Sequence, residues 1–417
     1  MINKDSKYTA FGGLHLIHRE VISKKLISFF NEHLPKRSSN AQYHFSDLIL
    51  SRIYTCFSGG SCAEDINYLE TTLAPLKKFS VPSADTLHYM EKELATPSQE
   101  LFSKSGTSNK INSNDSLNRL LVSTARFLKV LTCDDKDYCL DFDHQFIPTE
   151  KHDTTYSYKN KRGYFSGVAS INNTPVYVEN RNGNCHVNFN QKDTLERSLS
   201  MLHEHGIYPC KARMDSGSYT KEVVDFLDGE KMRFYIRAEQ SDTLLFNATL
   251  QDNWKEACIN QNLYQTTSIE HPFGEKTHRV VCYRWKNKTG QTRMITSDDY
   301  NYLFILTNDK QTPEEQIIRF YNKRGNSERM FDIQNNDFNW KNLPYSFLEQ
   351  NTVYLIIMAI ANVVYQWILK IISSITKTVN EKSRLKRFTF RVICMVAKVT
   401  RSGRRQVVKL YSNNFSP

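Results

Sequence analysis

The stretch TPEEQIIRFYNKRGNSERMFDIQNND, residues 312–337, predicts a helix that carries reactive side chains. Its start is well marked. The hydroxyl of Thr312 suits an N-cap, Pro313 suits the first helical position, and Glu315 completes a capping box. The sequence therefore predicts that this helix begins at residues 312–313.

One face of the predicted helix is apolar except for three side chains. At 100° per residue, a stripe of roughly 80° contains Ile317, Tyr321, Arg324, Glu328 and Phe331. A lone buried carboxylate is costly, so the glutamate on this face needs a cation or a metal ion. Two interpretations stay open: an internal Arg–Glu pair in a core helix, or a carboxylate that binds metal.

The middle of the chain predicts a mixed sheet with helices on its faces. In YCLDFDHQFI, residues 138–147, Asp141 and Asp143 point to the same side of a strand. CKARMDSG, residues 210–217, predicts a fourth strand that ends at Asp215. The predicted order is strand, hairpin, helix, strand, helix, strand, which is an α/β arrangement and not a continuous doubly wound sheet.

Three carboxylates thus fall at informative places: Asp143 or Asp141, Asp215, and Glu328. No cysteine or histidine cluster accompanies them, and oxygen ligands alone suit a hard cation such as Mg²⁺. Two such ions about 3.5–4 Å apart can promote phosphodiester displacement. Aspartates at strand ends also serve simply as turn residues, so the order of all three carries the prediction.

With these residues in place, the chain resembles a DDE transposase of a bacterial insertion sequence, in the cut-and-paste group with an RNase H-like catalytic domain. LDFD, which ends at Asp143, resembles the first-aspartate segment of that family, and RMDSG resembles the segment of the second, Asp215. Tyr321, Arg324 and Glu328 match the spacing of its Tyr-x2-Arg-x3-Glu signature.

The resemblance implies metal-dependent cleavage at the ends of an insertion sequence, followed by strand transfer into target DNA. Asp143, Asp215 and Glu328 would hold two Mg²⁺ (or Mn²⁺) ions, and Tyr321 and Arg324 would position a phosphate. Double-stranded DNA is the implied partner, bound by a homodimer, in the bacterial cytoplasm at the nucleoid. The signature also contains a lysine where this chain has Asn335, a position for which Lys341 is the nearest substitute.

Further DNA contacts are predicted outside the carboxylates. Trp285, in YRWKNKTG, is a candidate to stack on an unpaired or flipped base, although a tryptophan in a β-rich insertion is more often simply packed. Residues 377–417 contain eleven Lys or Arg and one acidic residue, whereas the whole chain has a net charge of +11. This basic tail predicts contacts with the DNA backbone. Its candidate residues are Lys386, Arg387, Arg404 and Arg405.

The sequence predicts an α+β multidomain chain with an RNase H-like mixed sheet. The expected parts are an N-terminal helical, DNA-binding region (1–132), the first part of the catalytic core (133–239), a β-rich insertion (240–308), the second part of the core (309–376) and the basic tail (377–417). TLLFNATL (243–250) and TRMITS (292–297) are expected strands of the insertion, and FTFRVICMV (388–396) is an expected strand of the tail. The N-terminal helices fit either a helix-turn-helix or a purely structural bundle.

Composition excludes several other classes. Nine cysteines occur without a CxxC pair, which fits a reducing cytosol and neither a zinc site nor a disulfide framework. The N-terminus has no apolar segment typical of a secretion signal. Residues 351–369 lack charged side chains and have the length of a membrane span, but Asn351, Asn362 and Gln366 interrupt them, which favours a buried core helix.

Two other functions remain as alternatives. The same carboxylates would serve another RNase H-like nuclease, of the resolvase type, that does not transfer strands. A non-catalytic DNA-binding protein derived from a transposase would keep the fold and tolerate loss of Asp215.

Overall fold

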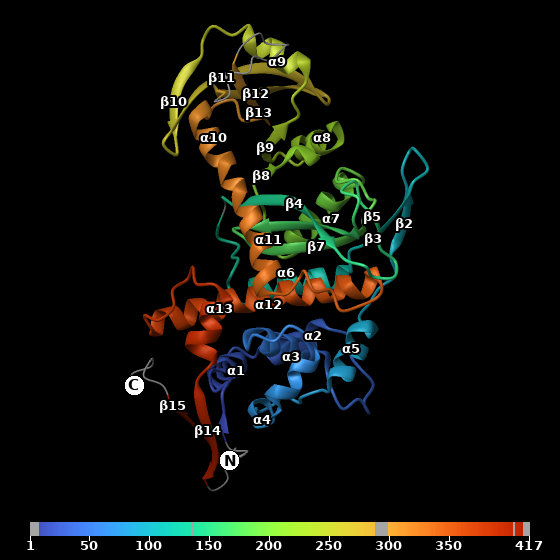
Figure 1. The fold of residues 1–417 in the computed structure, drawn as a ribbon, viewed down its shortest axis with the longest axis vertical. Coiled ribbons are helices and arrows are strands. Elements are labelled where there is room, and N and C mark those ends of the chain that lie inside the picture. The colour runs from blue at the N-terminus through green and yellow to red at the C-terminus, as the bar shows by residue number, and fades with distance from the viewer. Residues whose placement is uncertain (1–7, 136, 288–298, 403–404, 412–417) are drawn as a thin grey trace.

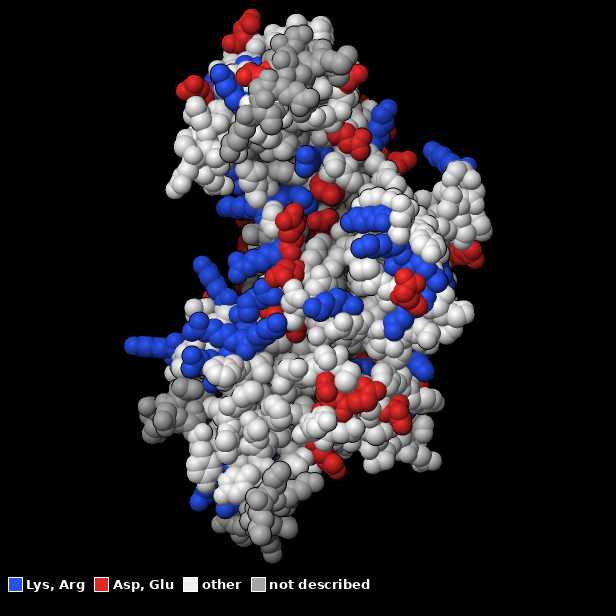
Figure 2. All heavy atoms as spheres, viewed as in Figure 1, with Lys and Arg blue, Asp and Glu red and all other residues white. Residues whose placement is uncertain are grey.

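The fold is seen in a computed structural model that describes residues 8–135, 137–287, 299–402 and 405–411. In Figure 1 a helical region lies at the bottom, a long helix crosses above it, and a mixed sheet continues upward into the insertion. The flank along which α10 and α11 run is hollowed between the insertion and the C-terminal part (Figures 1 and 2). The candidate catalytic residues belong to the elements that border this flank.

The N-terminal region is a bundle around one completely buried helix. Its elements are α1 (Gly13–Ser23), α2 (Leu26–His33), α3 (Phe45–Phe57), the 3-10 helix η1 (Glu64–Leu69), α4 (Glu70–Leu73) and α5 (Ala84–Glu93). All residues of α3 are buried. Arg52 of α3 donates to both carboxylate oxygens of Glu91 in α5, at 2.7 and 2.8 Å. This pair ties α5 to the centre of the bundle, since a buried carboxylate needs such partners.

The central sheet has the strand order β7-β6-β4-β8-β9. Its strands are β4 (Cys139–Pro148), β6 (Arg162–Ile171), β7 (Thr174–Asn182), β8 (Lys211–Met214) and β9 (Arg233–Ala238). Helix α7 (Gln191–Glu204) connects β7 to β8, and α8 (Lys221–Gly229) connects β8 to β9. Strands β4, β6 and β7 are antiparallel, whereas β4, β8 and β9 are parallel. This mixed sheet with connecting helices confirms the predicted fold class.

The sheet extends beyond this core at both edges. The insertion contains α9 (Asp242–Thr249), β10 (Lys255–Ile259), β11 (Asn262–Phe273), β12 (Lys276–Lys286) and β13 (Tyr300–Thr307). β13 pairs antiparallel with β9, so the insertion continues the sheet. At the other edge, β2 (Gln99–Phe102) and β3 (Ser108–Asn112) follow β7. Short β5 (Thr155–Tyr156) pairs with β6.

One strand predicted in the insertion is wrong, because TLLFNATL forms the helix α9. Ser241 caps it by accepting a hydrogen bond from the backbone N–H of Leu244, at 3.2 Å. Leu244, Leu245 and Ala248 are buried together, which is the period of a helix rather than of a strand. The strand predicted at TRMITS lies outside the described residues.

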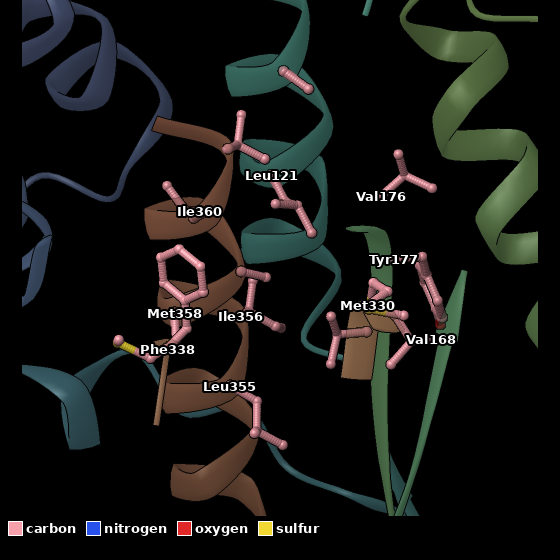
Figure 3. Close-up of a cluster of buried hydrophobic side chains, with 14 of the residues drawn as sticks. Leu121, Val168, Val176, Tyr177, Met330, Phe338, Leu355, Ile356, Met358 and Ile360 are labelled. Carbon is pink, nitrogen blue, oxygen red and sulfur yellow. The ribbon is translucent and has the colours of Figure 1, made fainter. Parts of the chain in front are cut away.

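Helix α12 (Leu348–Ile375) is the centre of the core. It packs beside α6 (Asp115–Phe127) and β7, and Figure 3 shows Leu355, Ile356 and Ile360 of α12 in the same cluster as Leu121 of α6. By length and composition α12 is a candidate membrane span, but 78% of its most apolar window is buried inside the protein. The prediction of a buried core helix is confirmed.

The C-terminal segment returns to the N-terminus. It forms α13 (Leu385–Phe388), a π-helical turn (Thr389–Ile393), β14 (Val396–Ser402) and β15 (Arg405–Tyr411). β1 (Tyr8–Thr9) pairs with β14, which pairs with β15. The strand predicted at FTFRVICMV is wrong over most of its length. Phe388, Val392 and Ile393 are all buried, a spacing that a helical turn satisfies and a strand does not.

Candidate active site

The stretch that opens the sequence analysis forms two helices and not one. α10 spans Glu314–Asn322, the 3-10 turn η3 spans Lys323–Gly325, and α11 spans Asn326–Asp337. The predicted capping box is wrong, because the hydroxyl of Thr312 donates to Asp309 Oδ2 at 2.7 Å and α10 has no side-chain cap. The carboxylate of Asp309 instead stabilises the segment that precedes α10.

The 3-10 turn changes which residues face inward. Each residue of a 3-10 turn advances by about 120° instead of 100°, so the pattern of α10 is not continued into α11. Tyr321 is buried and Arg324 is half-buried, but Glu328 is exposed. The prediction that all three share one inward face is therefore wrong for Glu328.

The two aspartates of β4 have different surroundings. Asp141 is buried and accepts two hydrogen bonds from Arg213 of β8, at 2.7 and 2.8 Å. Asp143 lies two residues further along, one residue past the last position where β4 pairs with β8. Asp215 follows directly after β8, so both carboxylates lie one residue past the last β4–β8 pair, Asp143 within β4 and Asp215 at the end of β8. The structure therefore brings Asp143, and not Asp141, together with Asp215.

The carboxylate of Asp143 is held by two donors. Arg324 Nη1 donates to its Oδ2 at 2.9 Å, and the backbone N–H of His144 donates to its Oδ1 at 2.8 Å. Burial and the nearby negative charge of Asp215 raise the pKa of Asp143 to about 6, against the opposing effect of Arg324. Two carboxylates that repel each other in this way are a candidate site for a cation.

Asp215 is oriented by the turn that follows it. It caps the short 3-10 helix η2 (Ser216–Ser218), and its Oδ1 accepts from the backbone N–H of Gly217 at 3.0 Å. A Cβ atom at Gly217 would lie 3.0 Å from Val187 Cγ2 and 3.1 Å from Asp215 Oδ1. Glycine in RMDSG therefore lets the turn close tightly against the carboxylate.

The pair of aspartates fits a divalent cation in the chemistry of its donors. Both offer carboxylate oxygens, which are the ligands that Mg²⁺ prefers. Glu328 stands apart in the first turn of α11. Within the described part of the chain, no three Asp, Glu, His or Cys side chains are grouped closely enough to hold a metal ion. The structure thus assembles two of the three predicted ligands.

Tyr321 has a structural contact at this site. Its hydroxyl donates to the backbone oxygen of Met214, the residue before Asp215, at 3.2 Å. Burial raises the pKa of its phenol to about 12. The ring thereby fastens the end of α10 to the end of β8, while its predicted contact with a DNA phosphate stays a prediction.

Trp285 borders an open pocket of about 560 Å³ in the insertion. Tyr264 meets its ring edge-on, with ring centroids 5.9 Å apart. Arg284 and Lys286 border the same pocket. An aromatic ring beside two cations suits a base and its phosphate, so the geometry is compatible with the predicted role.

Basic side chains gather along the hollowed flank, over α10, α11 and α13 (Figure 2). Lys386 and Arg387 of α13 are exposed, and Arg387 donates to the backbone oxygen of Thr378 at 3.1 Å. Arg404 and the side chain of Arg405 lie outside the described residues. Lys386 and Arg387 are therefore accessible for the predicted contacts with DNA phosphates.

The substitute proposed for the signature lysine has a local partner. Lys341 is exposed and its Nζ donates to Asn336 Oδ1 at 3.0 Å. Asn335, at the signature position itself, is half-buried in α11.

Two arginines near the site were missed by reasoning from the sequence. Arg213 belongs to RMDSG itself, and its period-2 spacing from Asp215 was the available signal. Arg237, in strand β9, borders a pocket of about 370 Å³ together with Ser216 and Gln240. A cation next to the residue after Asp215 is suited to a phosphate.

The chain was compared with known proteins. A protein-family model described as "Transposase DDE domain group 1" matches residues 5–416. No curated protein matches the chain.

Proposed function

The chain belongs to the family of transposases with a DDE domain of group 1, and on that premise we propose that it cuts DNA at the ends of its own insertion sequence and joins the freed ends to target DNA. The observation that supports this most is the meeting of Asp143 and Asp215 just past the last pair of two adjacent parallel strands, with Arg324 bound to the first. We further propose that a homodimer on DNA brings two ends together, in the bacterial cytoplasm at the nucleoid.

The carboxylates of Asp143 and Asp215 would hold divalent cations, Mg²⁺ or Mn²⁺, and Glu328 would be the third ligand after its exposed side chain turns inward. Bound there, such ions supply an activated hydroxyl group and a counter-charge for the leaving oxygen. In cleavage the oxygen of a water molecule forms a new P–O bond, the bond from phosphorus to the 3′-oxygen breaks, and the products are a 5′-phosphate and a 3′-hydroxyl. In strand transfer that hydroxyl forms a new P–O bond in the target and releases one target 3′-oxygen.

The other residues of the site bind and orient the DNA. Arg324 can exchange Asp143 for a phosphate oxygen, because a guanidinium forms charge-assisted hydrogen bonds with either anion. Trp285 stacks on an unpaired base at the cut end. The basic side chains of α13 contact the duplex backbone, and the binding affinity that they contribute falls steeply as the salt concentration rises.

The test uses the wild-type chain with a labelled duplex that carries the element's own end, a target plasmid and Mg²⁺. We expect nicks at the end and labelled joined products, no reaction in excess EDTA, and no nick in a duplex with a scrambled end. Nicks without joined products would indicate a nuclease of the resolvase type. Binding without any nick would indicate a non-catalytic DNA-binding protein.

Replacing Trp285 by alanine is expected to weaken binding of the nicked end by roughly tenfold, since stacking of one base on an aromatic ring contributes about 1–3 kcal/mol. Affinity for an uncut, fully paired duplex should change little. The measurement is fluorescence anisotropy with both DNAs. Phe246→Ala is the matched control, because Phe246 is an exposed aromatic residue of the same insertion and does not border the pocket. Equal affinity of wild type and Trp285→Ala for the nicked end would rule out stacking.

A further inference from the structure

Arg213 connects three elements just below the candidate active site. Its Nε and Nη2 donate to the two oxygens of Asp141 in β4, at 2.7 and 2.8 Å. Its Nη1 donates to the backbone oxygen of Phe320 in α10, at 2.7 Å. The guanidinium lies over the Phe320 ring, 5.0 Å from its centroid. The Arg213 side chain of β8 is thus hydrogen-bonded both to the neighbouring strand β4 and to the C-terminal end of α10.

The contact with Phe320 caps α10. Phe320 lies in the last turn of that helix, and its backbone oxygen also accepts from the backbone N–H of Lys323, so Arg213 supplies a second donor at this end. A cation at this end also meets the negative end of the helix dipole. The buried Arg213 therefore stabilises the point at which α10 gives way to η3.

The site is built on two levels of the sheet. At the first level Asp141 of β4 is registered directly with Arg213 of β8. Two residues further on, past the last paired position, Asp143 and Asp215 form the second level. Successive residues of a strand point to opposite faces, so the members of both levels share one face.

The helix crosses both levels. At the first level Arg213 holds the backbone oxygen of Phe320, and at the second, four residues later, Arg324 reaches Asp143 at 2.9 Å. Arg324 lies four residues after Phe320, within the turn η3 that directly follows α10. The point at which the end of α10 is attached to the sheet therefore determines the position of the Arg324 guanidinium. The Tyr321 hydroxyl on Met214 is the second fastening.

We propose that Asp141 and Arg213 are positioning residues of the reaction: the pair fastens the C-terminal end of α10 to the sheet, so that Arg324 stands beside Asp143 and Asp215. Neither residue touches the DNA or the reacting atoms. The inference rests on the proposed function, since it concerns the rate of the same cleavage.

The test removes both charges together. Breaking one partner of a buried pair destabilises a protein strongly, whereas replacement of both by apolar residues of similar volume is often neutral. Asp141→Leu/Arg213→Met is therefore expected to keep the wild-type melting temperature and KM for end DNA. Its kcat for nicking should fall by about 100-fold, the loss expected from a misplacement of roughly 1 Å. Hydrogen exchange of residues 318–325 should become faster.

The chain offers a matched control. Arg52 and Glu91 form a pair with the same two distances, also buried, in the helical bundle. Arg52→Met/Glu91→Leu removes an equivalent pair away from the sheet, and its kcat should equal that of the wild type. Arg213→Lys keeps the charge but replaces the planar fork by a point charge, and an intermediate loss of kcat at unchanged KM is expected.

The outcomes separate the two proposals. A wild type that does not nick its own end refutes the proposed function. A wild type that nicks, together with a double variant of equal kcat, refutes the positioning role alone. If Asp141→Leu/Arg213→Met does not fold, Arg213→Lys decides: wild-type kcat in that variant overturns the inference.

Discussion

Replacing Asp143 by asparagine is expected to lower the nicking rate by about a thousandfold, equivalent to roughly 4 kcal/mol of activation free energy. The reason is the pairing of Asp143 with Asp215, whose combined negative charge gives the site its affinity for a divalent cation. Affinity for end DNA should persist or increase, because the change removes a negative charge. The measurement is single-turnover nicking at saturating Mg²⁺, with binding followed by gel shift.

Two further variants complete this experiment. Asp193→Asn removes an exposed carboxylate from the first turn of α7, and it should nick as the wild type does. Glu328→Gln tests whether the exposed glutamate joins the pair during the reaction, in which case its loss should approach that of Asp143→Asn. Wild-type nicking by Asp143→Asn would mean that the site lies elsewhere.

Replacing Glu179 by glutamine is expected to lower the free energy of unfolding by about 3–5 kcal/mol at pH 7, the typical effect of breaking a buried pair. Glu179 of β7 is completely buried and accepts from Arg181 Nε at 2.7 Å and from Arg197 Nη2 at 2.5 Å. When Glu179 loses its charge, the buried guanidinium of Arg181 no longer has an anionic partner. Urea denaturation measures the difference. Glu204→Gln, at the exposed pair with Arg119, is the control and should change stability little.

The same variant predicts a dependence on pH. Burial by itself raises the pKa of Glu179, but Arg181 and Arg197 together hold it below its ordinary value of 4.5. A carboxyl whose pKa is lower in the folded state contributes stability above its unfolded pKa, and this contribution disappears as the pH falls through the folded value. The stability difference between wild type and Glu179→Gln should therefore be largest near neutral pH and shrink below pH 4.5. A difference that is constant from pH 7 to pH 3 would contradict the charge-based explanation.

Several features were readable from the sequence because they depend on short-range patterns. Alternation in LDFD predicted a strand with both aspartates on one face, RMDSG predicted a strand that ends in aspartate, and the strand and helix order predicted the mixed sheet. The uncharged segment 351–369 predicted a buried helix, since its three amides argue against a membrane. Each of these follows from the period of the backbone and from the cost of burying polar groups.

Other features depend on partners far away in the chain. Alternation placed Asp141 and Asp143 on the same side and could not choose between them. The choice follows from Arg213, some seventy residues later, which pairs with Asp141 and leaves Asp143 to meet Asp215. Tail residues predicted as a strand became helical because Phe388, Val392 and Ile393 fill the core together.

By itself the sequence determined the strands of the central sheet, the buried helix and the presence of aspartates on two of those strands or at their ends, because local periodicity and composition encode them. Only the tertiary structure decided that the helix of residues 312–337 divides at Lys323–Gly325, which leaves Glu328 exposed and turns Arg324 toward Asp143. The physical reason is that α10 is fastened where it ends by Arg213 and Tyr321, through contacts with β8 that no local pattern contains.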